Sequence, residues 1–302
     1  SWLKKKISIT TSTVVSFLIT GAIGGGAAYG AGNKAGTGGN NNSVAWGQGS
    51  SVDNDSVAVG ANASAVSASA GNNPTVTSKG VAIGNNATAK GSVSVGDLAS
   101  STHFGVAVGY NAGTQNTTTG YSFSNVTIGA NTRVGVQGTQ AAQGIAIGSG
   151  VHADEGAWAK GDQSISIGAN TTASGNSSIA IGGDDLLSVS TKTSSYSDAR
   201  FDKNGNKIGG NSNNTASINN IFNTLTGRGT ILHQGTGTDG KFYTAWRNTE
   251  SGQGAVALGV KSISGDIALA IGTFSEATGT NSVAIGLSLI HISEPTRLGM
   301  IS

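Results

Sequence analysis

A five-residue segment, apolar at its second and fourth positions and closed by glycine, occurs twelve times in this chain. The copies begin with "SVAWG" and end with "SVAIG", and they lie 12 to 14 residues apart where no extra segment separates them. We take the closing glycines as the structural glycines of the unit: Gly47, Gly60, Gly84, Gly96, Gly109, Gly129, Gly148, Gly168, Gly182, Gly259, Gly272 and Gly286. Twelve copies of one unit predict a repeat architecture, which takes precedence over any local prediction of helix or strand.

Each copy has the alternating pattern of a short β-strand. In "SVAIG" at 282–286, Val283 and Ile285 point to one side of the strand and Ala284 to the other. β-Branched residues at every second position favour extended backbone. The five-residue segment therefore predicts one strand in every unit.

A second, smaller pattern lies between the copies, as in "NNATAKG", "ANTTASG" and "TFSEATG". It predicts a shorter strand followed by a turn with left-handed backbone at Gly91, Gly175 and Gly279. Each unit is therefore expected to run strand, turn, short strand, turn.

A unit of this size cannot fold alone, because it buries only two or three small side chains. Stacked units pair each strand with its copy in the next unit, which predicts an all-β parallel roll, a solenoid of 12–14-residue repeats. Composition agrees, since 49 of 302 residues are glycine and only 36% are hydrophobic and 5% aromatic. We expect a thin rod whose small-residue face lets identical rods approach closely.

The first 31 residues have the order of an export signal. Three lysines at 4–6 precede an apolar stretch and then small residues, "GGGAAYGAG". We predict a signal peptide over 1–31, lacking its own start, and a Gly/Asn-rich linker over 32–41; a retained membrane anchor is the alternative. Without those lysines the formal charge is 14 − 15 = −1, which predicts no nucleic-acid partner.

The repeats are expected to cover 42–182 and 254–286, interrupted by a non-repeat insertion over 183–253. "ARFDKNGNKIGG" and "TILHQGTGTDGKFYTAW" predict two hairpins. Between them "TASINNIFNTLTG" predicts a short amphipathic helix with Ser217 as its cap. This α+β insertion either forms a private core on the rod or presents a ligand-binding surface.

The last residues, 287–302, match nothing upstream. "LSLIHISEPTR" resembles the translation of a transposase adapter used in preparing sequencing libraries. We interpret 287–302 as a sequencing artefact and expect the genuine sequence to be cut off at Gly286, with whatever followed it lost.

No catalytic motif is present in the sequence. "DKNGN" at 202–206 partly matches a calcium loop, but it lacks the third oxygen position before glycine, and a tight hairpin turn is the favoured interpretation. The acidic pairs Asp53 with Asp55 and Asp154 with Glu155 are expected in solvated turns. We therefore expect no enzyme activity, no cofactor and no metal.

The repeat "[SG]-[VI]-A-[IV]-G-x-x-[AST]-x-A-x-G" resembles the head repeat of trimeric autotransporter adhesins, the YadA-like family. The resemblance implies a left-handed parallel β-roll and a side-by-side homotrimer. It also implies display on a Gram-negative cell surface, through a stalk and an outer-membrane anchor that we expect beyond the truncated end of this sequence.

A head of this kind would be the passenger of a type V (autotransporter) secretion system. It would bind extracellular matrix proteins, host-cell receptors or other bacteria, without making or breaking a bond. Candidate contact segments are 62–79, 110–124 and the insertion. A self-associating structural or biofilm-matrix protein without a receptor is the alternative.

Overall fold

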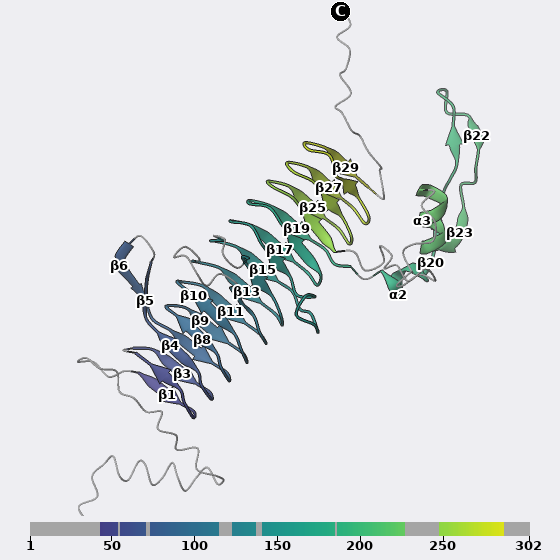
Figure 1. Cartoon of the computed structure of the whole chain (residues 1–302). Helices are drawn as coiled ribbons and strands as arrows, with labels where there is room; N and C mark the ends of the chain where they lie inside the picture. The colour runs from purple at the N-terminus through teal and green to yellow at the C-terminus, as the bar shows by residue number, and fades with distance from the viewer. Residues whose placement is uncertain are drawn as a thin grey trace, which may run out of the picture.

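The computed structural model describes residues 43–53, 55–70, 73–114, 123–136, 141–184, 186–226 and 248–286. The chain winds into a straight roll, and each turn of the roll adds one strand to each of two sheets (Figure 1). All neighbouring strands in these two sheets are parallel. The predicted all-β parallel repeat architecture is confirmed.

The first sheet has twelve strands, all formed by the five-residue segments. In order they are β1 (Val44–Trp46), β3 (Val57–Val59), β7 (Val81–Ile83), β9 (Val93–Val95), β11 (Val106–Val108), β13 (Val126–Ile128), β15 (Ile145–Ile147), β17 (Ile165–Ile167), β19 (Ile179–Ile181), β25 (Val256–Leu258), β27 (Leu269–Ile271) and β29 (Val283–Ile285).

The second sheet has eleven shorter strands. They are β2 (Ser51–Val52), β4 (Ser64–Val66), β8 (Thr88–Lys90), β10 (Ser100–Thr102), β12 (Gly113–Thr114), β14 (Arg133–Val134), β16 (Trp158–Ala159), β18 (Thr171–Ala173), β24 (Thr249–Ser251), β26 (Ile263–Ser264) and β28 (Glu276–Ala277).

Equivalent positions stack on one another from coil to coil. In β27 and β29, for example, Leu269 pairs with Val283, Ala270 with Ala284 and Ile271 with Ile285. This register stacks the central residue of each strand, alanine in nine of the twelve, on the central residue of the next, so a one-residue slip would turn the outward apolar side chains to the wrong face.

The core of the roll is built from small side chains. Ala58, Ala82, Ala107, Ala146 and Ala180 at the centres of first-sheet strands are all fully buried. The outer positions of the same strands are only half-buried or exposed, as at Val283 (50%) and Ile285 (55%). Our expectation of a small-residue outer face was therefore wrong: in the first sheet the small central residues face the interior, and the Val and Ile residues on either side of them face outward.

The closing glycines lie where successive coils come closest. Ten of the twelve have φ between +108° and +135°; Gly148 and Gly182 are the exceptions. At Gly84 (φ +134°), a Cβ atom would lie 2.2 Å from the carbonyl oxygen of Gly96 on the next coil. Both the backbone conformation and the spacing between coils thus require glycine at this position.

Two excursions leave the roll. The first is a hairpin of β5 (Ala68–Ala70) and β6 (Asn73–Ser78), which projects from the side of the rod (Figure 1). The second is the insertion after β19, which contains α2 (Leu187–Ser190), β20 (Thr193–Tyr196), β21 (Arg200–Phe201), β22 (Lys207–Gly209), β23 (Asn214–Ser217) and α3 (Ile218–Thr226).

The predicted hairpin at 199–210 and the predicted helix are both present. β21 pairs with β22, and β20 pairs with β23 outside them, so the hairpin is longer than the sequence suggested. The Ser217 hydroxyl accepts a hydrogen bond from the Asn220 N–H (3.3 Å), as expected of a helix cap. The second predicted hairpin, at 230–246, lies outside the described residues, as do the predicted signal peptide, the linker and the tail.

The described part of the insertion packs onto the roll. Phe222 of α3 and Phe274 of the coil between β27 and β28 are both fully buried, with ring centroids 5.3 Å apart. Leu186 belongs to the same cluster, and Ile218 and Val260 pack against it. This core is shared with the rod. The roll resumes at Thr249 of β24, where the sequence placed the return at 254.

Replacing Phe222 with alanine should release α3 from the rod. Removing a fully buried phenylalanine costs about 3–5 kcal/mol, and here the loss weakens the docking of the insertion onto the roll. We expect limited proteolysis to cut the insertion much faster in Phe222→Ala, while amides in coils remote from Phe274, such as that of Ile147, keep their hydrogen-exchange protection. Phe201→Ala, at a side chain that is 57% exposed, is the matched control. Equal cleavage of both variants would show that the aromatic contact does not hold the insertion.

Candidate functional site

The outer face of the first sheet is aliphatic along its entire length. Both outward positions of every strand carry Val, Ile or Leu, except for Trp46 at the end of β1. Exposed fractions of large apolar side chains on this face are 47% at Val44, 57% at Trp46, 40% at Ile83, 41% at Ile128 and 37% at Ile181. A soluble protein seldom leaves an apolar strip of this length open to water, so the face is suited to being covered by another surface.

The outer face of the second sheet is different in character. Its outward side chains include Ser64, Thr88, Lys90 and Glu250. The two faces differ, because the first sheet presents aliphatic residues and the second presents mainly polar and charged residues, with Val66 and Ile263 among its apolar exceptions. This division separates a surface suited to burial from one suited to remain in water.

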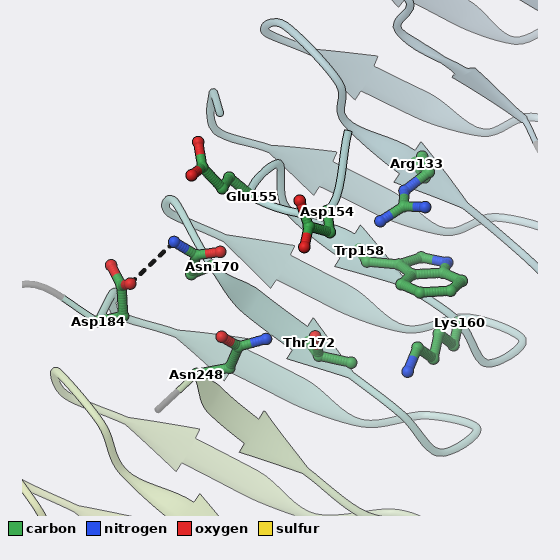
Figure 2. Close-up of a pocket in the computed structure, with 9 residues that line it drawn as sticks. All are labelled: Arg133, Asp154, Glu155, Trp158, Lys160, Asn170, Thr172, Asp184 and Asn248. Carbon is green, nitrogen blue, oxygen red and sulfur yellow. Dashed lines mark hydrogen bonds between the residues drawn. The ribbon is translucent and has the colours of Figure 1, made fainter. Parts of the chain in front are cut away.

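A pocket of about 390 Å³ lies on the polar side, beside the point where the insertion leaves and rejoins the roll. Its lining residues, drawn in Figure 2, are Arg133, Asp154, Glu155, Trp158, Lys160, Asn170, Thr172, Asp184 and Asn248. Consecutive coils supply them, because Arg133 pairs with Trp158 and Trp158 with Thr172 across β14, β16 and β18.

Trp158 holds two cations against its ring. The Arg133 guanidinium carbon lies 4.0 Å and the Lys160 ammonium nitrogen 4.2 Å from a ring centroid, and Figure 2 shows them on opposite sides of the indole. The indole Nε1–H donates to the Gly135 carbonyl oxygen (2.8 Å), which fixes the ring. Such cation–π contacts hold positive charge in place without neutralising it.

The two cations lack a carboxylate partner at contact distance. Within the described part of the chain, the one ion pair closer than 4.0 Å joins Lys79 to Asp55. Burial lowers the pKa of Arg133, and the nearby charge of Asp154 acts in the opposite direction. The Nε of Arg133 is buried and has no hydrogen-bond partner among the described residues.

The opposite side of the pocket is acidic and amide-rich. Asp184, only 8% exposed, accepts a hydrogen bond from the Asn170 side chain (2.9 Å). Glu155 accepts from the N–H groups of Val151 (2.8 Å) and His152 (2.9 Å), and its side chain is turned away from Trp158 in Figure 2. The pocket thus offers cations at one end, and hydrogen-bonding oxygens and amides at the other.

The sequence singled out two acidic pairs, and the structure gives their members different surroundings. Asp154 and Glu155 both line the pocket, which the sequence alone did not indicate. Asp55 pairs with Lys79 at 3.6 Å on the surface. Asp53 accepts hydrogen bonds from the Ser56 hydroxyl (2.6 Å) and the Ser67 N–H, so it links the roll to the base of the β5–β6 hairpin.

The "DKNGN" segment forms the tight hairpin turn that the sequence favoured. The Asp202 carboxylate accepts from the N–H groups of Asn204 (2.9 Å) and Asn206 (2.8 Å) and from the Asn206 side chain (3.0 Å). The Asn206 side chain and backbone hydrogen bonds lower the pKa of Asp202. Among the described residues, no three His, Cys, Asp or Glu side chains are grouped as a metal site.

Acid should loosen the base of the β5–β6 hairpin. Burial raises the pKa of Asp53, but hydrogen bonds from Ser56 and Ser67 and the charge of Lys79 outweigh it and leave the pKa below its usual 3.8. Because the pKa of Asp53 is lowered in the folded protein, the stabilisation from its ionised carboxylate is fully present above pH 3.8. It is lost as the pH falls through the pKa that Asp53 has in the folded protein.

We therefore expect the hydrogen-exchange protection factor of the Ser67 amide to be constant above about pH 5 and to fall toward pH 2. Asp53→Asn should lower it across the whole range. The Ile147 amide within the first sheet is the internal reference. A pH-independent protection factor at Ser67 would contradict the role given to Asp53.

These observations define a class of protein. The chain forms a thin parallel β-roll, and the aliphatic outer face of its first sheet is suited to burial against another surface. In the described segments no helix is long and apolar enough to cross a membrane.

Comparison with known families agrees with this class. Residues 159–184 and 264–288 match the family model of the YadA head domain repeat, in two copies. The chain therefore carries YadA-like head repeats, which support a head domain of the trimeric autotransporter adhesin family. Heads of that family are surface-exposed passengers in Gram-negative bacteria. No curated protein was found to match the chain.

Proposed function

We propose that this chain is the head of a homotrimeric surface adhesin that acts by binding and carries out no catalysis. The observation that carries the proposal is the aliphatic outer face of the first sheet. Exposed fractions of 36% at Val108, 50% at Val283 and 55% at Ile285 in a single chain are costly in water, and three rolls packed side by side through this face would bury them.

Export and anchoring belong to the same proposal. The signal-like order of residues 1–31 favours passage to the cell surface, where the head would be carried on a stalk and an outer-membrane anchor. The left-handed sense of the coil, taken from the family resemblance, is also part of the proposal. Three identical heads on each molecule and many molecules on each cell would make weak single contacts sufficient for adhesion.

The polar sheet and the excursions are the surfaces left for partners in such a trimer. The β5–β6 hairpin and the β21–β22 hairpin both extend away from the roll (Figure 1). At the second, Phe201 and Ile208 are 57% and 67% exposed. Matrix proteins, host-cell receptors or neighbouring bacteria are the proposed partners of these surfaces.

The proposal is tested with the head fused after residue 286 to a trimerising coiled coil, which replaces a stalk. We expect saturable binding to immobilised collagen or fibronectin, or to epithelial or bacterial cells, that the monomeric head shows more weakly. Filament growth that depends on protein concentration, without binding to any of these surfaces, would instead support a self-associating matrix protein.

A further inference from the structure

The Trp158 pocket has the features of a binding site that the family match does not assign. Its cationic end consists of Arg133 and Lys160, which the indole holds at fixed positions on either side of one ring. Arranged charges on a rigid sheet suit recognition of an anion, because little rotamer entropy is left to lose on binding. Surface lysines with free side chains would not have this advantage.

The rest of the pocket indicates what else the ligand must carry. The lining contains no aliphatic side chain; beyond the cations and the indole it offers carboxylates, the Thr172 hydroxyl and the amides of Asn170 and Asn248. Carboxylates accept hydrogen bonds from hydroxyl groups, and amides both donate and accept. A ligand with one anionic group and several hydroxyls would satisfy both ends, whereas a simple anion would use only the cationic end.

The size and position of the pocket agree with such a ligand. A volume of about 390 Å³ lies within the range of small-molecule sites. The pocket is on the polar second sheet, so packing of three rolls through the aliphatic first sheet would leave it open. Asp184 and Asn248 come from the two ends of the insertion, so docking of the insertion completes the wall.

We propose that this pocket binds an acidic sugar residue, with its carboxylate or sulfate group at the cationic end, against Arg133 or Lys160 at the edge of the Trp158 indole, and its hydroxyls on Asn170, Asp184 and Asn248. Acidic saccharides of this kind occur in the matrix around animal cells and on bacterial surfaces. The biological meaning rests on the proposed adhesive function, but binding itself is a property of the isolated protein.

The first experiment titrates the purified protein with three tetrasaccharides and follows the tryptophan Nε1–H signals by NMR. A hyaluronan fragment supplies carboxylates, a heparin fragment supplies sulfates as well, and chitotetraose is the neutral control. We expect one or both acidic fragments to bind at least tenfold more tightly than chitotetraose and to shift the Trp158 signal, assigned with Trp158→Phe. The stronger acidic ligand identifies the source of the anion. Equal binding of chitotetraose would overturn the proposal.

The second experiment uses variants. Lys160→Met and Arg133→Met keep the apolar stems and remove the charges, and each should weaken acidic-fragment binding at least tenfold, while Lys160→Arg should restore most of it. Lys207→Met, on the remote hairpin β21–β22, is the matched control with the same charge change. If Arg133→Met lowers the melting temperature, Lys160→Met with an unchanged melting temperature decides the question.

Three further results would overturn the assignment. Equal weakening by Lys207→Met would indicate general attraction of polyanions, and tri-glutamate binding as tightly as the sugars would indicate an acidic-peptide site. Acidic-fragment binding unchanged in Lys160→Met would place the ligand elsewhere. These outcomes are separable from the proposed function: adhesion without saccharide binding removes only the pocket assignment, and saccharide binding without adhesion removes only the adhesin proposal.

Discussion

Gly84→Ala is expected to break the roll at its third coil. The added Cβ would lie 2.2 Å from the Gly96 carbonyl oxygen, in a backbone conformation (φ +134°) that side chains rarely adopt. Backbone strain of about 1–2 kcal/mol and overpacking of about 1–3 kcal/mol should together lower the free energy of unfolding by several kcal/mol. Because each coil contacts only its neighbours, the damage should centre on the coils that contain β7 and β9.

Urea unfolding followed by circular dichroism, with hydrogen exchange to locate the opened coils, measures this effect. Gly183→Ala is the matched control, because its Cβ would meet only the Ala169 carbonyl oxygen at an ordinary 3.6 Å. We expect the control to unfold with the wild type. An equal, small effect of both substitutions would mean that the coils can move apart at no cost.

Ile165→Lys combined with Ile167→Lys should separate the three rolls while leaving each one folded. Both side chains lie on the outer face of β17, at the middle of the aliphatic strip, so the single roll loses no core contact. In the proposed trimer these residues would be buried, and burying unpaired ammonium groups costs several kcal/mol. We therefore expect a folded head whose subunits no longer touch along this face.

The readout is cross-linking in the head fused to a trimerising coiled coil. The chain has no cysteine, so a single cysteine can be placed at will. Ile147→Cys on the first sheet should form disulfides between subunits, and the double lysine change should slow this strongly. Ser64→Cys on the second sheet is the control and should not cross-link. Equal cross-linking at both positions would exclude the aliphatic face as the interface.

The repeat made most of the fold predictable from sequence. Strand, turn, short strand and turn recur in every complete coil. The alternation of "SVAIG" matches a three-residue strand whose central residue is buried and whose two flanking residues point outward. The direction of burial was not predictable in the same way. Alternation separates Val283 and Ile285 from Ala284, but it does not say which side is inside; that becomes visible only when the coils are stacked.

Turn conformations were predicted less well. A left-handed backbone was expected at Gly91, Gly175 and Gly279, and of these only Gly91 has positive φ (58°). Elsewhere the left-handed residue lies two positions later, at Ser177 (φ 52°) and Asn281 (φ 58°). Stacking imposes the turn on whatever residue occupies that position.

Bulky residues show the same effect. Leu98, Ile267 and Phe274 have φ between 53° and 61°, although such side chains disfavour this region. Hydrogen bonds to the preceding coil hold them there, for example from the Leu98 N–H to the Asn85 carbonyl oxygen (2.9 Å) and from the Phe274 N–H to the Val260 carbonyl oxygen (3.0 Å). Local preference is overridden because each coil copies the path of the one before.

The Trp158 pocket could not have been found from the sequence. Its two cations are 27 residues apart, and Asp184 and Asn248 are separated by most of the insertion, so no local motif connects them. The pairing of Arg133 with Trp158 depends on extra residues between β14 and β16, which shift the spacing away from the regular unit. To predict a site formed between coils, one must know which residues pair across neighbouring strands, and only the structure shows that pairing.

The orientation of the hydrogen bonds in the roll has a mechanical consequence. Because the strands cross the rod and their hydrogen bonds join one coil to the next, those bonds run along its length. A force that pulls the two ends apart therefore acts on every junction between coils in series. A single chain would yield first at its weakest junction, as a zipper does, so load-bearing strength in such a rod would have to come from chains lying beside it.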